Sequence, residues 1–62
     1  MVLYNLYLVL NNEKVKIFDN DIQGIVYEGL SENIPHELMH ELVHDVTIAR
    51  KNNSTYFLIN IN

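Results

Sequence analysis

The sequence predicts one α+β domain in which a single helix packs on one face of a mainly antiparallel sheet of about five short strands. Two observations lead to this class. Short segments rich in apolar residues are separated by Asn, Asp and Gly, and residues 35–45 have the apolar spacing of a helix. With 62 residues, the chain has material for one domain, residues 1–62. The predicted order of elements is β-β-β-α-β-β.

The strands are indicated by composition and by alternation. The segment before Asn11 and Asn12 is rich in Val, Leu and Tyr, which suit a pleated surface, and the Asn pair is a turn signal. Residues 14–17 alternate polar with apolar side chains, so they should pair with the first strand as a hairpin. Gly24 and residues 51–54 supply further turns. The predicted strands are residues 2–10, 14–17, 25–27, 46–49 and 56–61.

Three signals predict that a helix begins near residue 35. Asn33 can cap the first turn, and Pro35 suits that turn because its missing N–H would have no partner inside the helix. Glu37 places negative charge near the positive end of the helix dipole. We therefore expect a helix over residues 35–45 whose apolar arc lies on the sheet.

The first and last predicted strands have apolar side chains on both faces. A strand of this kind expects cover on both sides, whereas one helix covers only one face. The sequence therefore predicts that the uncovered face meets a second copy in a homodimer, and a sheet that curls and closes on itself is the alternative. The predicted self-association surface consists of Leu3, Tyr7, Val9, Phe57 and Ile59.

Charge is distributed unevenly in a chain with a net charge of −4. The four basic residues lie at positions 14, 16, 50 and 51, and residues 17–49 contain seven carboxylates without a Lys or Arg. Because a phosphate backbone is bound through clustered basic residues, we expect no direct binding of nucleic acid. The longest apolar run, Leu6 to Leu10, is far shorter than a membrane span, and no secretory signal is recognisable. We expect a cytoplasmic protein without a cofactor.

The segment HELMHELVH contains the H-E-x-x-H pattern twice and in this respect resembles zincin-type metallopeptidases. In that interpretation His36, His40 and His44 are candidate zinc ligands, and Glu37 or Glu41 is the general base. A helix would spread the three histidines over about 12 Å, too far for one ion. We therefore interpret them as boundary residues of the amphipathic helix. A zinc-binding protein or a zinc-dependent hydrolase is the alternative.

The same histidines allow a second alternative that needs no metal. Glu37 and Glu41 lie three residues before His40 and His44, so they are neighbours on a helix. Nearby carboxylates favour the charged form of histidine. The helix would then be more stable at mildly acidic pH than at pH 8.

The run Val26-Tyr27-Glu28-Gly29-Leu30-Ser31-Glu32-Asn33-Ile34-Pro35 resembles small uncharacterised proteins of phages and mobile elements from AT-rich Gram-positive bacteria. The nine asparagines fit an AT-rich coding bias. This resemblance implies a small accessory or interaction protein in a cytoplasm and brings no catalytic residues with it. The sequence as a whole therefore predicts a non-enzymatic protein that binds another protein and associates with itself.

Overall fold

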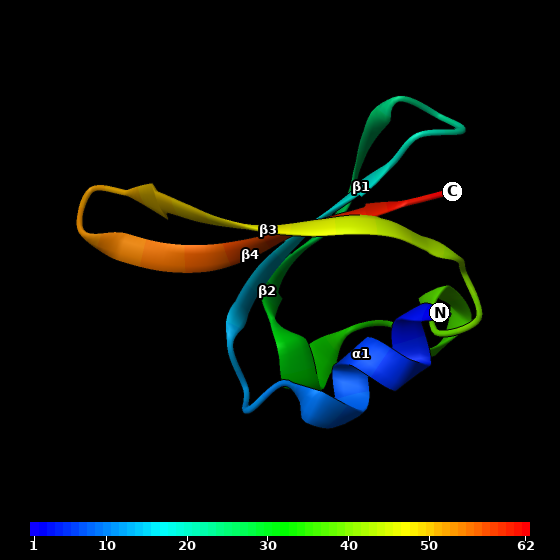
Figure 1. Ribbon diagram of the computed structural model, residues 1–62, viewed down its shortest axis with the longest axis horizontal. Coiled ribbons are helices and arrows are strands. Elements are labelled where there is room, and N and C mark those ends of the chain that lie inside the picture. The colour runs from blue at the N-terminus through cyan, green and yellow to red at the C-terminus, as the bar shows by residue number, and fades with distance from the viewer.

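The computed structural model describes residues 1–62 and confirms the α+β class, with one helix and a four-stranded sheet (Figure 1). The strand order is β2-β1-β4-β3, in which β1–β2 and β3–β4 are antiparallel hairpins and β1–β4 is a parallel pair. The sheet is therefore mixed, and it has one strand fewer than predicted. The elements are α1 Leu3–Val9, β1 Lys14–Asp19, β2 Gly24–Leu30, β3 Val43–Lys51 and β4 Ser54–Ile61.

The first predicted strand, residues 2–10, is wrong, because this segment forms helix α1. Leu3, Leu6, Tyr7 and Leu10 recur at the spacing of one helix face. Leu3 is completely buried, and the other three pack against the core. The apolar side chains of residues 2–10, interrupted only by Asn5, satisfy the strand and the helix pattern equally, so their period could not decide between the two. Helix α1, with seven residues, is much shorter than a helix that spans a membrane.

The predicted helix over residues 35–45 is also wrong. The segment contains only a short 3-10 turn, η2 His36–Leu38, and then joins β3 at Val43. Its backbone bonds span three residues, as in Leu38 N to Pro35 O (3.1 Å) and Glu41 N to Leu38 O (3.1 Å). Pro35 therefore precedes a turn as expected, but pairing of β3 with β4 ends the helical path. Tertiary pairing overrides the local helix signals here.

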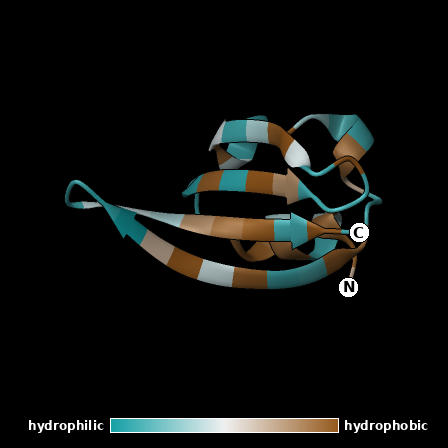
Figure 2. Ribbon diagram, turned by 90° about the horizontal axis from the view of Figure 1, so that it is seen from above, coloured by the Kyte–Doolittle hydropathy of each residue, from teal (hydrophilic) through white to brown (hydrophobic).

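The core lies between the sheet and the segments that cover one of its faces. Val15 and Ile17 of β1 and Ile59 and Ile61 of β4 point to this face, as expected from the alternation of side chains along a strand. Figure 2 shows the alternation of hydrophobic and hydrophilic residues along the strands. A 3-10 helix, η1 Ser31–Asn33, precedes the covering segment around η2. The remaining buried apolar residues are Leu3, Ile34 and Met39.

The hairpin of β3 and β4 projects from the body of the molecule and ends in a two-residue turn (Figure 1). Asn52 and Asn53 both have positive φ angles, 52° and 65°, which is the conformation of a type I′ turn. Lys51 pairs with Ser54 across this turn. The turn predicted at residues 51–54 is therefore confirmed. Asn is the residue that tolerates this conformation best after Gly.

Candidate functional site

Strand β3 is an edge strand whose outer side is mostly unpaired. It pairs with β4 on one side and has no strand neighbour on the other. The N-terminus covers only the beginning of the outer side, where Val43 N donates to Met1 O (2.9 Å) and Val2 forms an isolated bridge with Leu42. A register shift between Val43 and Asp45 follows. The free edge therefore runs over residues 45–51.

The pairing with β4 determines which backbone groups of the free edge point outward. Lys51 and Ser54 are bridge partners on either side of a two-residue turn, so they must form a hydrogen-bonded pair. N–H and C=O groups alternate in direction along an antiparallel strand. The outward groups of β3 are therefore those of Val46, Ile48 and Arg50.

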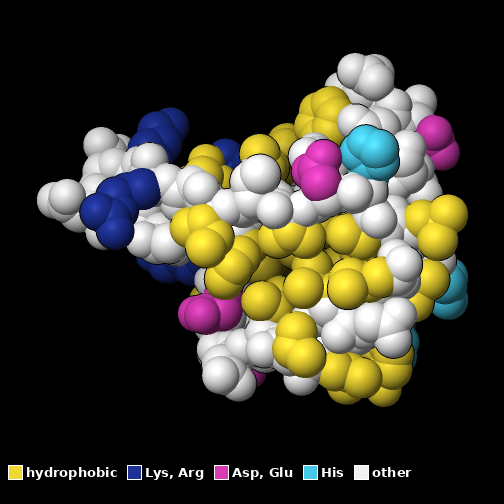
Figure 3. Space-filling model, viewed as in Figure 1, with side chains coloured by type: hydrophobic (Ala, Val, Ile, Leu, Met, Phe, Trp, Pro, Cys, Tyr) yellow, Lys and Arg dark blue, Asp and Glu magenta, His cyan; other side chains and the backbone are white.

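Apolar side chains accompany the free edge on the helix side of the sheet. Val46 and Ile48 lie opposite Ile59 and Phe57, which face the core. Ile48 nevertheless remains 69% exposed. Figure 3 shows hydrophobic side chains gathered on the face of the molecule between β3 and α1. The exposed apolar residues of α1 are Tyr4, Leu8 and Val9.

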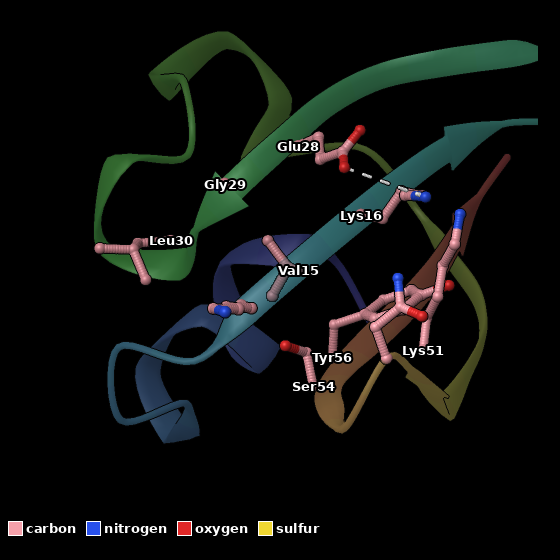
Figure 4. Close-up of a pocket in the computed structure, with 10 residues that line it drawn as sticks. Val15, Lys16, Glu28, Gly29, Leu30, Lys51, Ser54 and Tyr56 are labelled. Carbon is pink, nitrogen blue, oxygen red and sulfur yellow. Dashed lines mark ion pairs between the residues drawn. The ribbon is translucent and has the colours of Figure 1, made fainter.

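A basic cleft of about 410 Å³ lies where β1 and the projecting hairpin diverge (Figure 4). Lys14, Lys16 and Lys51 line it together with Tyr56. Lys16 Nζ lies 3.9 Å from Glu28 Oε2 and 5.1 Å from the centre of the Tyr56 ring. This ion pair is the only one in the chain, so Lys51 has no anionic partner.

The basic cleft gathers three of the four basic residues, which the sequence places at two distant positions. Parallel pairing of β1 with β4 brings the beginnings of both strands together. Sequence reasoning missed this cleft because it predicted no parallel pair. The segregation of basic residues toward positions 14–16 and 50–51 was the available signal.

The histidines of HELMHELVH do not lie on one helix. His36 is in η2, His40 is in the turn that follows, and His44 is in β3; all three are exposed. No group of three or more His, Asp or Glu side chains is arranged to hold a metal ion. The i, i+4 geometry that the hydrolase alternative requires is therefore not formed, and the predicted acid-stabilised helix does not exist.

The two candidate general bases, Glu37 and Glu41, do not lie on a helix beside the histidines as the hydrolase alternative requires. Glu37 is exposed in η2. Glu41 Oε2 accepts a hydrogen bond from Asn62 Nδ2 (3.0 Å), which ties the turn after η2 to the C-terminal residue. This hydrogen bond gives Glu41 a structural role, and neither carboxylate belongs to a group of three or more His, Asp or Glu side chains that could hold a metal ion.

The predicted self-association residues are mostly inside the molecule. Leu3 and Ile59 are completely buried, so they are not available to a partner. Tyr7 and Phe57 are partly buried against the core, and Val9 alone is freely exposed, at 72%. The prediction depends on both the first and the last predicted strand having one uncovered apolar face. Other exposed large apolar side chains include Ile48 of β3, Tyr4 and Leu8 of α1, and Ile25 and Leu30 of β2.

Comparisons of the chain with family models, with curated proteins and with solved structures each found no match.

Proposed function

We propose that this chain is a non-enzymatic, cytoplasmic protein-binding domain that associates first with a second copy of itself through the free edge of β3. The observation that supports this proposal is that residues 45–51 form an unpaired strand edge and that Ile48, in the middle of this segment, is 69% exposed. An accessory role in a phage or mobile element belongs to the same proposal. The proposal does not include direct binding of nucleic acid, because the net charge of the chain is −4 and Glu28 pairs with Lys16 of the basic cleft.

An unpaired strand edge binds another strand by completing its backbone hydrogen bonds. Proteins that avoid such pairing place charges, prolines or bulges along the edge. The centre of the free edge, Val46-Thr47-Ile48-Ala49, has none of these. Its charged residues, Asp45, Arg50 and Lys51, lie only at the two ends. The edge is therefore unprotected where pairing would begin.

The opposite edge of the sheet, formed by β2, is protected. Tyr27 pairs with Ile17 and Ile25 pairs with Phe18, so Val26 is an extra residue that makes a bulge. A bulge twists and interrupts an edge. The exposed carboxylate of Glu28 adds a charge to the same strand. This contrast between the two edges favours β3 as the binding edge.

Ile48→Lys is expected to convert a dimer into a monomer without unfolding the chain. The side chain is 69% exposed, so its replacement costs the monomer little, whereas each copy would bring a lysine to the middle of its free edge. Native mass spectrometry and circular dichroism of untagged protein measure both properties. Ile22→Lys, at a 65% exposed site in the β1–β2 turn, is the matched control and should remain dimeric. A wild-type protein that stays monomeric at every concentration would contradict the proposal.

A further inference from the structure

We infer that the second copy binds in one register, with a two-fold axis through Ile48 and with Asp45 of each copy opposite Lys51 of the other. This inference rests on the proposed function and specifies its geometry. It follows from the extent of the free edge, from the direction of its backbone groups and from the positions of its charges.

The length of the free edge favours a register that is centred on Ile48. The edge begins at Asp45, after the register shift and the Met1 contact with Val43, and it ends at Lys51, before the Asn52-Asn53 turn. When two identical strands pair antiparallel about a two-fold axis, residues equally far from the centre oppose each other. Ile48 is the midpoint of 45–51. Only an axis at Ile48 therefore pairs the whole free edge with itself.

The backbone directions agree with the same centre. A hydrogen-bonded pair requires outward groups on both strands. An axis at Ile48 pairs Ile48 with Ile48 and Val46 with Arg50, and all of these have outward groups. An axis between two neighbouring residues would set outward groups against inward ones. The hydrogen bonds would then not form.

Two competing registers are equally near and satisfy the backbone directions. An axis at Ala49 would oppose Val46 to Asn52 of the turn and leave Asp45 without a partner. The other is an axis at Thr47. It would oppose Arg50 to His44, which lies in the irregular part of the strand between Val43 and Asp45. It would also oppose Lys51 to Val43, whose N–H already donates to Met1 O. In this register Arg50 and Lys51 therefore have no partners within the free edge of the other copy.

The charged side chains at the two ends of the free edge also favour an axis at Ile48. Asp45 and Lys51 pair with Asn60 and Ser54 of β4 on the face away from the helix. An axis at Ile48 places these opposite charges across from each other at both ends of the interface, in non-hydrogen-bonded positions where Cα atoms are about 4.5 Å apart. Lys51 has no anionic partner within its own chain, and Asp45 accepts one hydrogen bond, from Asn60 Nδ2. Like charges would not meet anywhere along the pair.

The helix side of the sheet also becomes continuous in this register. Residues that oppose each other in an antiparallel pair point to the same face, so both helices lie on one side of the joined sheet. The two exposed Ile48 side chains meet at the axis. The hydrophobic area between β3 and α1, which Figure 3 shows for one copy, then adjoins the same area of the second copy. Burial of this apolar surface adds to the backbone hydrogen bonds.

Disulfide trapping tests the register directly, because the chain contains no cysteine. In the inferred register, Ile48→Cys brings two Cα atoms to about 5.5 Å, within the range of a disulfide. Thr47→Cys, one residue away, leaves its two Cα atoms diagonal to each other at about 7–8 Å, outside that range. Under mild oxidation, I48C should form a covalent dimer and T47C should not.

The outcomes of this experiment separate the register from the proposed function. Trapping of T47C but not I48C, or of neither variant while the wild type is a dimer, overturns the register and leaves self-association standing. A monomeric wild type together with no trapping overturns both. Trapping of I48C alone, in a wild type that is dimeric, supports both.

Exchange of the two charges gives an independent readout. Asp45→Lys and Lys51→Asp should each weaken the dimer by about 3- to 30-fold in Kd, because two cross-strand pairs are lost. The double exchange D45K/K51D should recover most of this loss. Asp21→Lys, in the exposed β1–β2 turn, is the matched charge control and should leave the Kd unchanged. A double variant no tighter than either single variant would overturn the register.

Discussion

Ile59→Ala is expected to leave much of the domain unfolded at room temperature. Ile59 is completely buried on the central strand β4, where it lies between Ile17 of β1 and Val46 of β3. Truncation of a buried isoleucine costs about 2–5 kcal/mol. A core in a chain of this size rarely supplies more than about 3–5 kcal/mol in total. The loss is therefore comparable with the whole free energy of unfolding.

Urea denaturation followed by circular dichroism measures this effect. The matched control is Ile22→Ala, because Ile22 is 65% exposed in the β1–β2 turn. The control should change the free energy of unfolding by no more than about 0.5 kcal/mol. Equal denaturation midpoints for the two variants would contradict the central position of Ile59.

Proline substitutions at neighbouring positions of β3 should have very different effects. The N–H of Thr47 points to β4, so Thr47→Pro removes an internal bond of the sheet and should cost about 2–4 kcal/mol. The N–H of Ile48 points away from β4, at the free edge, where proline is tolerated. Ile48→Pro should therefore remain folded, but it should lose the ability to form a dimer.

Thermal melts of both proline variants, together with their masses by native mass spectrometry, test this alternation. Each variant serves as the control for the other, because the two positions are adjacent on one strand. An Ile48→Pro protein that is less stable than Thr47→Pro would reverse the assignment of outward groups. A folded Ile48→Pro protein that still forms dimers would move the binding surface away from β3.

Much of the sheet could be predicted from local patterns. The segments 14–17, 25–27, 46–49 and 56–61 all lie inside strands of the structure. Alternation in the first of these and β-branched residues in the third are direct consequences of a pleated, half-buried surface. The turn at residues 51–54 was predictable because the φ angles of a two-residue hairpin favour Asn.

The wrong elements have one cause, which is that their conformation depends on distant partners. Residues 2–10 have side chains that suit a strand and a helix equally, so the local pattern does not decide between the two. Residues 35–45 carry valid helix-start signals, but β4 offers a strand partner from Val43 onward. The parallel pair of β1 and β4 has no local signal at all, because the partners are some forty residues apart in sequence.

The sequence predicts self-association, but it does not predict which residues form the candidate surface. Excess apolar surface in so short a chain indicated self-association, which stays a prediction. The predicted residues are wrong in part because Leu3 belongs to a helix and not to a strand, and because the face of β4 that carries Ile59 is the covered one. Ile48 became a candidate once the strand order placed β3 at an edge. Local sequence patterns do not determine the order of the strands in the sheet.

Residue-resolved amide hydrogen exchange at high and low protein concentration tests the central claim most directly. The amides of Val46, Ile48 and Arg50 point outward, so we predict rapid exchange in dilute protein and slow exchange in concentrated protein. The amides of Thr47 and Ala49, which point to β4, should be protected at both concentrations and provide the internal control. Rapid exchange of the three outward amides at every concentration would contradict binding through the edge of β3.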